Sequence, residues 1–514
     1  MGTMRFARVI ASVAVIGLAA GACSGQSGDE AGGGSGSTQF SYRLPDRFKA
    51  WLDDLNWLPE LEKQSGVKVE TFDGGPEDGY YQQLDLALSS GKMQDAVIAN
   101  ISQTEVYGQQ GAFQDLAPLI EKSAPNLKKY IDANPRYKQL ITAKDGKVYG
   151  LPAESPRISP VTFYRSDMLK AAGVSKPPAT MAEFTDALRT LKKHFASTKN
   201  YFPLTGRDAF LRWAYVYDAA FRADADGTVH GIADDKLGNT DLLSPGFKDM
   251  IAWYQQLYAE GLVDPEWIAG ANTEDSWQTK MLTGRGSVSD DFFTRPSWFL
   301  NNGGPKNDPK YAIDVLPAFK TTTGAQGKVP ANPRWNLNRV FAISSTAKNA
   351  DAIIKFIDNL YSEKGETAMH FGVDGTSYKV VDGKPQYTLD FAVEGNKPAG
   401  TKAWNFLQDR LTFPAPVDNQ AYYQWMDKKT KSFAGQYFNA YLTDTPVIKY
   451  DADQLKKRTE LLAAVEPFVL TELTKFVNGK RPMSEWDQFV ADAKQKGYQQ
   501  LNDIENAAWS ATSK

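Results

Sequence analysis

The sequence predicts an exported α/β protein with two lobes. About 475 residues follow the first forty, which exceeds the roughly 250 to 300 residues that one hydrophobic core usually organises. Helix-like patterns alternate along the chain with short apolar strands, which is typical of sheets covered by helices. An apolar segment near the N-terminus indicates export. We therefore expect two α/β lobes outside the cytoplasm.

The first 22 residues have the pattern of a secretory signal peptide. Arg5 and Arg8 supply positive charge, and residues 9–20 are almost wholly apolar before the small residues Gly21 and Ala22. As a helix this run spans only about 18 Å, too short for a hydrocarbon core of roughly 30 Å. The segment is therefore predicted to be cleaved. Met4 is as good a start as Met1.

Cys23 is the only cysteine and follows Ala20-Gly21-Ala22. This stretch resembles the bacterial lipobox, in which the cysteine is acylated and becomes the mature N-terminus. The alternative is a secreted protein with one free thiol, which is a liability in an oxidising compartment. We expect Cys23 to carry a lipid anchor on the outer face of the cytoplasmic membrane. A single cysteine also excludes a disulfide within the chain.

A tether is predicted after the anchor. Residues 23–38 are rich in Gly and Ser and hold almost no apolar side chain, so they cannot bury a core and should remain flexible. Folding is expected to begin near Gln39.

Charge and composition narrow the ligand class. A net charge of −3 disfavours nucleic acid, whose partners usually carry a basic stripe. Aromatic residues form 12% of the chain, and their faces stack on sugar rings, although large cores also use them. His194, His230 and His370 are widely scattered, so we predict no zinc site, and no cofactor.

Strands and helices alternate from the start of the folded region. Residues 67–71 have the pattern of a strand, residues 80–89 of a helix and residues 95–99 of a buried strand. Binding loops follow the carboxyl ends of strands in such sheets, which places Asn100 at a candidate pocket edge.

Longer helices follow a predicted crossing between the lobes. Residues 145–152 form a turn and a strand that runs into Pro-bounded chain, where a crossover is expected. Thr180 and Glu183 have the spacing of a capping box and open a helix that ends near His194. Further helices are predicted over residues 245–260 and 347–364.

Six motifs stand along the chain in a characteristic order. They are residues 58–69, the pattern LxxxLxSGxxxD from Leu84, Gly150-Leu151-Pro152 followed by Phe163-Tyr164-Arg165-Ser166-Asp167, and residues 257–266, 352–365 and 372–378. Together they resemble bacterial extracellular solute-binding proteins of family 1, which serve ATP-driven sugar importers. The resemblance covers nearly all of residues 45–510 and is closest to the long lipoprotein branch that includes alginate-oligosaccharide-binding proteins.

The resemblance implies a periplasmic-binding-protein-like clamshell of type II, with mixed sheets flanked by helices. Lobe 1 would comprise residues 39–153 and 321–375, and lobe 2 residues 154–320 and 376–514. A carbohydrate would bind between the lobes of a monomer, with an oligosaccharide as the first choice and a monosaccharide as the second, and peptide-like or other polar solutes stay open as alternatives. The permease subunits of an ABC importer would recognise the closed form, because closure shifts a two-state population.

One departure from the long branch concerns calcium. Alginate-binding relatives resemble an EF-hand after the helix that ends here near His194, whereas this chain has residues 196–203 there, without a carboxylate. Ca²⁺ usually takes about six to eight oxygen ligands. Residues 224–227 contain two acids but lack later acidic ligands, so we predict no metal.

A sugar site needs aromatic platforms and planar hydrogen-bonding side chains, because neighbouring hydroxyls present paired donors and acceptors. Asp290, Asp291 and Phe292 follow a predicted strand at residues 287–289, where the resemblance puts a cleft loop. Either they line the cleft, or the acids cap the helix of Trp298.

The segment from Arg207 to Tyr217 is predicted to be helical, with Trp213 and Tyr217 on one face. That face either lines the cleft or packs in the core. Residues 332–339 are too polar for a core and predict a cleft loop that carries Trp335 and Arg339.

Three further candidates depend on the resemblance or on loop composition. Arg157 and Tyr378 lie at expected crossings or cleft edges, where each is a ligand contact or a hinge strut, and Trp404 follows a Gly- and Pro-containing loop. The predicted ligand-binding residues are Asn100, Arg157, Arg207, Trp213, Tyr217, Asp290, Asp291, Phe292, Trp335, Arg339, Tyr378 and Trp404.

Two other functions would use the same features. An extracytoplasmic glycosidase or lyase needs two carboxyl groups about 5 to 10 Å apart across a sugar bond, whereas neighbours such as Asp290 and Asp291 tend to diverge. A sugar-sensing surface lipoprotein would use the same clamshell. The length of the resemblance favours binding for transport, and we expect no catalytic residue.

Overall fold

Two separate hydrophobic cores organise the computed structural model, which describes residues 38–53, 57–77, 79–223, 231–234, 236–331, 334–389, 412–443 and 448–512. Core 1 gathers apolar side chains from Phe40 to Leu151 and from Trp335 to Met369. Core 2 gathers those from Val161 to Phe319 and from Tyr422 to Leu501. The described residues from Thr38 onward form one compact unit. The two cores agree with the predicted two-lobed α/β fold, and we call the parts around them lobe 1 and lobe 2.

The cores also locate the crossings between the lobes. Val329 and Ala331 pack in core 2, although the predicted lobe 1 includes residues 321–375. Phe413 and Ala415 pack in core 1, although the predicted lobe 2 includes residues 376–514. The chain therefore crosses after Glu154, again after Ala331 and again after Ala415. The predicted boundaries differ because they follow the segment order of the resemblance rather than side-chain packing.

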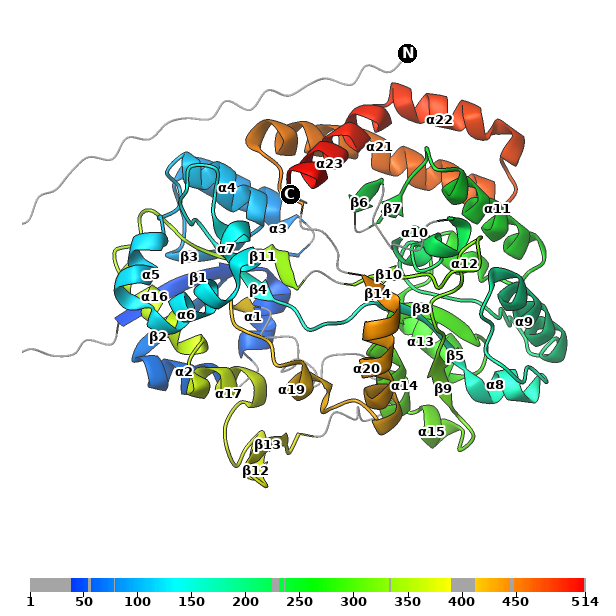
Figure 1. The fold of residues 1–514 in the computed structure, drawn as a ribbon, viewed down its shortest axis with the longest axis horizontal. Coiled ribbons are helices and arrows are strands. Elements are labelled where there is room, and N and C mark those ends of the chain that lie inside the picture. Colours follow the sequence, from blue (N-terminus) through cyan, green and yellow to red (C-terminus); the bar gives the residue numbers. More distant parts are fainter. Residues whose placement is uncertain are drawn as a thin grey trace, which may run out of the picture. The chain divides into compact units, whose positions relative to one another are not determined.

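Lobe 1 is built on a mixed sheet with the strand order β2-β1-β3-β11-β4 (Figure 1). β1 is parallel to β2 and β3, and β11 is antiparallel to β3 and β4. All of β3 is buried, as expected for a strand covered on both faces. The strands are β1 (Thr38–Leu44), β2 (Val67–Asp73), β3 (Ala96–Ala99), β4 (Leu151–Glu154) and β11 (Trp335–Ile343).

Helices of lobe 1 pack on this sheet and on one another. α16 buries the predicted apolar stripe that includes Ile353 and Ile357, and contacts α2, α5 and α6. The predicted helix over residues 347–364 is wrong at its end, because Ser362 caps a second helix. The helices are α1 (Asp46–Asp53), α2 (Trp57–Ser65), α3 (Tyr80–Ser90), α4 (Ile101–Gln109), α5 (Ala117–Ser123), α6 (Pro125–Ala133), α7 (Pro135–Ile141), α16 (Ala350–Leu360) and α17 (Glu363–Phe371).

Lobe 2 contains an antiparallel sheet with the order β8-β5-β9, in which Asp290 and Asp291 face Thr162 and Val161 of β5. The predicted capping box of Thr180 and Glu183 is present at α9. The elements are β5 (Pro160–Arg165), α8 (Ser166–Ala171), α9 (Met181–His194), α10 (Phe210–Ala214), a 3-10 turn (Asp218–Phe221), β6 (Ile232–Asp234), β7 (Gly238–Thr240), α11 (Pro245–Ala259), α12 (Pro265–Ile268), α13 (Glu274–Leu282), β8 (Val288–Phe292), α14 (Arg295–Asn301), α15 (Gly304–Asn307), β9 (Ile313–Val315) and β10 (Val329–Pro330).

The C-terminal part is largely helical, as predicted. α21 contacts α11 and α23 (Figure 1). The last helices bury Leu473, Phe476 and Trp486 in core 2. Its elements, after the hairpin β12 (Tyr378–Val381) and β13 (Lys384–Tyr387), are α19 (Asn419–Tyr423), α20 (Lys428–Tyr441), β14 (Leu442–Thr443), α21 (Ala452–Val477), a 3-10 turn (Met483–Glu485), α22 (Trp486–Gln495) and α23 (Tyr498–Thr512). Within the described ranges, no helix is both long and apolar enough to cross a membrane.

Candidate functional site

Strand β8 ends in a group of charged and aromatic side chains that we call the β8 cluster. Four predicted site residues meet there: Arg207, Trp213, Asp291 and Phe292. The other members are Asp208, Arg212, Glu274, Trp277 and Arg295. The cluster therefore combines both side-chain types that a sugar site requires.

Asp291 is the centre of the cluster and is completely buried. Arg207 donates to both of its oxygens, from Nε to Oδ2 at 2.6 Å and from Nη2 to Oδ1 at 3.2 Å. Arg295 Nε lies 3.3 Å from Oδ2. Burial alone would raise the pKa of Asp291, but the charges of the two arginines outweigh it and lower the pKa. The carboxyl is thus held as an anion.

The arginines have further carboxylate partners. Arg207 Nη1 lies 2.8 Å from Asp208 Oδ2 and 3.7 Å from Glu274 Oε2, and Arg295 Nη1 lies 3.1 Å from Glu274 Oε1. The three hydrogen bonds of Arg207 to Asp291 and Asp208 fix the plane of its guanidinium group, since the planar fork favours paired contacts. Arg295 is held by ion pairs alone, and its Nη1 is buried without a hydrogen-bond partner.

Aromatic rings frame the charged groups. The guanidinium carbon of Arg207 lies 5.1 Å from the centre of the Trp213 ring, and that of Arg295 lies 5.2 Å from Trp277. Phe292 is only half-buried and meets Trp213 edge to face at 5.3 Å. Phe292 therefore has a partly exposed ring beside the arginines.

The backbone of Arg207 is rigidly positioned. Its carbonyl oxygen accepts hydrogen bonds from the indole nitrogens of Trp213 (3.0 Å) and Trp267 (3.1 Å). Asn272 donates to the carbonyl of Gly206 at 2.6 Å, and a Cβ at Gly206 would lie 2.4 Å from the Trp267 ring. The predicted helix from Arg207 to Tyr217 is wrong, because these tertiary bonds hold Arg207 outside α10, which begins at Phe210.

Asp290 and Tyr217 lie on the opposite face of β8, inside core 2. Asp290 Oδ1 accepts from Thr162 Oγ1 at 2.7 Å and from the Tyr217 hydroxyl at 2.8 Å, and both residues are fully buried. Burial raises the pKa of Asp290 to about 7 against these hydrogen bonds. The side chains of Asp290 and Asp291 point to opposite faces of β8, which confirms the expected divergence. Neither acid caps the helix that carries Trp298, because its N-cap is Thr294.

In lobe 1 the predicted residues lie apart from one another. Trp335 begins strand β11 and is buried, with its indole donating to the Tyr130 hydroxyl at 3.1 Å, so the predicted cleft loop is wrong from this residue onward. Asn100 caps α4 through a bond from Gln103 N at 2.8 Å. Arg339 stacks over Phe48 at 4.3 Å, and its Nη1 is buried without a hydrogen-bond partner.

Arg157 lies on the first crossing between the lobes. Its backbone nitrogen donates to Asn419 Oδ1 at 2.7 Å, and its carbonyl accepts from the Tyr423 hydroxyl, so it ties the first crossing to the third. Ser155 donates to the carbonyl of Arg334 at 2.7 Å, which ties the first crossing to the second. Tyr378 begins β12 and packs on Phe371 at 5.8 Å.

Glu154 joins all three crossings and was missed from the sequence. It accepts from Tyr130 at 3.0 Å, from Val417 N at 3.2 Å, and from Arg334. Its partners are distant in sequence, so no local pattern points to it. Arg295 was also missed, because it begins α14 while its partner Asp291 lies in β8, and the turn between them brings the two together. Cys23 and Trp404 lie outside the described residues.

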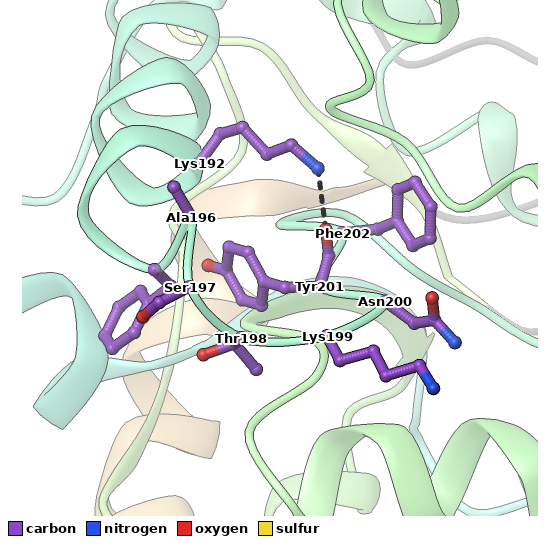
Figure 2. A pocket seen from close by; sticks show the side chains of 9 residues that line it. Lys192, Ala196, Ser197, Thr198, Lys199, Asn200, Tyr201 and Phe202 are labelled. Atoms are coloured by element: carbon purple, nitrogen blue, oxygen red, sulfur yellow. Dashed lines mark hydrogen bonds between the residues drawn. The ribbon is translucent and has the colours of Figure 1, made fainter.

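A separate cavity of about 340 Å³ lies at the end of α9, lined by Lys192 and residues 195–202 (Figure 2). Lys192 Nζ donates to the carbonyl of Tyr201 at 2.8 Å and lies 4.8 Å from the Phe202 ring.

Among the described residues no group of three or more His, Asp, Glu or Cys could hold a metal ion. Residues 224–227 are not described.

Comparison with known proteins identifies the family. Residues 44–367 match the family model described as bacterial extracellular solute-binding protein. The chain belongs to this family.

Relatives of this solute-binding protein match along most of its length. The fructooligosaccharide ABC transporter substrate-binding protein FusA of Streptococcus pneumoniae serotype 4 is 24% identical to this chain. The alignment covers 86% of this chain and 84% of FusA. A maltooligosaccharide ABC transporter solute-binding lipoprotein of S. pneumoniae strain R6 is 26% identical over 71% of this chain and 79% of its own. The alginate-binding protein AlgQ2 has the same fold, with a TM-score of 0.74, 19% identity, and coverage of 93% and 99%.

Proposed function

We propose that this solute-binding protein captures an oligosaccharide between its two lobes and delivers it to the permease subunits of an ABC importer. The β8 cluster carries the proposal. It presents a partly exposed aromatic ring, Phe292, beside the guanidinium groups of Arg207 and Arg295. Sugar rings offer an apolar face for such a ring and neighbouring hydroxyls for such groups.

The predicted site residues divide into three roles under this proposal. Arg207 and Phe292 contact the sugar from lobe 2, and Arg339 does so from lobe 1. Asp290, Tyr217, Trp213 and Trp335 are buried and support the surfaces around them, and Asn100 fixes the start of α4. Arg157 and Tyr378 act in or near the hinge, and Trp404 remains a predicted contact.

The hydrogen bonds among the crossings support a hinge mechanism. Three crossings are joined through Glu154, Ser155 and Arg157, so rotation of the lobes is confined to a few backbone positions. Ligand binding between lobes then stabilises a closed state, which the permease reads. The relatives FusA and the maltooligosaccharide-binding lipoprotein are named for oligosaccharide transport, which supports this class of ligand.

A thermal-shift screen across mono- and oligosaccharides tests the proposal. A ligand that binds only the folded state raises stability by RT ln(1 + [L]/Kd), which is about 2.7 kcal/mol at one hundred times Kd. We expect at least one oligosaccharide to raise the midpoint of unfolding. If no saccharide shifts it, the carbohydrate proposal fails. Product analysis after long incubation separates binding from catalysis, since multiple turnover to shorter sugars would indicate a glycosidase or lyase.

The anchor is proposed on the sequence of residues 20–23. We expect Cys23→Ser to move the protein from the membrane fraction to the soluble fraction, because acylation needs the thiol, and to leave saccharide binding unchanged. Fractionation followed by immunoblotting measures this, with Ser24→Ala as the matched control. Membrane retention of the Cys23→Ser protein would contradict the anchor.

A further inference from the structure

His370 lies in the last turn of α17, beside the third crossing between the lobes. The residue is only 3% exposed, and its carbonyl oxygen accepts from the Tyr387 hydroxyl at 2.6 Å. α17 contacts α19, the helix that follows the third crossing. The imidazole ring therefore has a fixed position next to the hinge.

The two ring nitrogens of His370 meet groups of opposite kind. Nδ1 lies 2.7 Å from the carbonyl oxygen of Glu366, and Nε2 lies 2.7 Å from the backbone nitrogen of Asp418. A carbonyl oxygen only accepts, so Nδ1 carries a proton, and a backbone N–H only donates, so Nε2 carries none. The hydrogen-bond network thus assigns the neutral Nδ1–H tautomer.

Three consecutive residues of the third crossing, 417–419, are each bonded to a group outside it. The pairs are Val417 N to Glu154 Oε2 (3.2 Å), Asp418 N to His370 Nε2 (2.7 Å), and Arg157 N to Asn419 Oδ1 (2.7 Å). His370 is the anchor of these three whose side-chain type normally changes its charge near neutral pH. The middle bond of the set is therefore the one that mild acid can remove.

Protonation of His370 removes the acceptor that the third crossing uses. An ordinary imidazole takes up a proton below about pH 6.5. The added proton sits on Nε2, so that two N–H groups then face each other where one hydrogen bond stood. The Asp418 amide loses its partner, and the imidazolium needs an acceptor of its own.

Carboxylates around α17 are acceptors toward which an imidazolium can turn. Burial, and then the charges of Glu154, Asp418 and Glu363, raise the pKa of Glu366, which lies one turn before His370. Arg334 of the second crossing pairs with Glu154. The elements packed on α17 also carry the charged residues Glu60, Glu62 and Lys63 (α2), Asp351, Lys355 and Asp358 (α16) and Lys384 (β13).

We infer that His370 is a positioning residue of the hinge: its neutral ring holds the third crossing, and its protonation releases the crossing, so that sugar binding weakens in acidic surroundings. The release of the crossing follows from the bonds of His370. The effect on binding rests on the proposed function, because a crossing with one anchor fewer loses more conformational freedom when the lobes close on a ligand.

NMR spectroscopy of the mature chain with ¹⁵N-labelled histidine rings tests the assigned tautomer. The chain has three histidines, so the ring signals are few, and His370→Gln identifies those of His370 by their loss. At pH 7.5 we expect His370 to be neutral with the proton on Nδ1. A proton on Nε2 would overturn the inference, because that nitrogen could not accept from Asp418.

Hydrogen–deuterium exchange of the ligand-free mature chain tests the release. We expect the protection of the Asp418 amide, corrected for its intrinsic exchange rate, to fall at least about fivefold between pH 7.5 and 5.5, as loss of one hydrogen bond implies. The buried Asp290 changes global stability in the opposite direction, since burial raises its pKa to about 7, so this loss would be local.

Two histidine variants separate His370 from other titrating groups. His370→Gln places an acceptor without a titrating proton at a similar reach, and should keep the Asp418 amide protected at both pH values. His194→Gln is the matched control, because His194 is an exposed histidine at the end of α9 and its loss should leave the wild-type fall intact. Glu366→Gln should also retain the fall.

The outcomes separate this inference from the proposed function. Unchanged protection of Asp418 in wild type, an equal fall in His370→Gln, or loss of the fall in Glu366→Gln would each overturn the role of His370. Calorimetry should show the best oligosaccharide binding wild type at least about threefold more weakly at pH 5.5 than at pH 7.5, and His370→Gln equally at both. Equal wild-type affinities would overturn the effect on binding. If no saccharide binds, the proposed function fails, while the exchange result still decides the release.

Discussion

Replacing Asp291 by alanine is expected to lower the free energy of unfolding by about 3 to 5 kcal/mol. The carboxylate is fully buried and is the shared partner of Arg207 and Arg295. Its removal leaves two guanidinium groups, each only 9% exposed, without their common anion. Removal of one partner from a buried ion pair costs far more than the net value of the pair, because an uncompensated charge remains.

Chemical denaturation followed by tryptophan fluorescence measures this effect. Asp275→Ala removes the same charge from an exposed position and should change the free energy of unfolding by less than about 0.5 kcal/mol. An Asp291→Ala protein within about 1 kcal/mol of wild type would show that the arginines find other partners, and that Asp291 is not the centre of the cluster.

Asp290 is expected to make stability fall as pH rises from about 4 to about 7. Burial raises its pKa to about 7 from the usual 3.8, although Thr162 and Tyr217 donate hydrogen bonds to it. Over this interval the folded state binds the proton more tightly than the unfolded chain. The contribution of Asp290 to the free energy of unfolding is therefore fully present below pH 4. It is lost as pH rises through about 7, and the total loss is up to about 4 kcal/mol.

The isosteric change Asp290→Asn should remove this slope. The variant carries no ionisable group at the position, so its stability relative to wild type should increase with pH and level off above about pH 7. Measuring both proteins from pH 4 to 8 isolates Asp290, since the opposite contribution of Asp291, whose pKa is lowered, is common to both. Parallel profiles would mean that the buried carboxyl titrates as an ordinary aspartic acid.

Local periodicity predicted much of the fold. The strands at residues 67–71 and 95–99, the helix at 80–89 and the capping box at Thr180 all form as the pattern indicates. Each depends on neighbours within a few residues, such as the bond from Glu183 N to Thr180 Oγ1 at 3.3 Å. Local chemistry of this kind is visible in a sequence.

The failures share one physical cause, which is bonding to distant residues. The polarity of residues 332–339 predicts a loop, but the Trp335 indole bonds to Tyr130 and its strand pairs with β4. The spacing of Trp213 and Tyr217 predicts one helical face, but α10 ends at Ala214, and the Arg207 carbonyl accepts from the distant Trp267 indole. Tertiary partners override local preference at these positions.

The candidate site was predictable in its residue types and only partly in its geometry. The sequence predicts that the adjacent acids Asp290 and Asp291 follow a strand at residues 287–289 and that their side chains diverge. The predicted strand is wrong at its end, because β8 runs through Phe292, and neighbours in a strand point to opposite faces. Which acid enters the core is set by the register of β8 with Thr162 and Val161 of β5, and a single sequence does not contain that register.

Calorimetric titration of the best oligosaccharide into wild type and into Phe292→Ala tests the central claim most directly. Phe292 is the partly exposed aromatic ring of the β8 cluster, and loss of an aromatic contact at a binding site typically costs at least about 1 to 2 kcal/mol, or about tenfold or more in affinity. Phe72→Ala is the matched control, since Phe72 is 44% exposed at the end of β2 in lobe 1. The account predicts one sugar per wild-type chain, at least tenfold weaker binding to Phe292→Ala and unchanged binding to Phe72→Ala. Equal affinity of wild type and Phe292→Ala would contradict it.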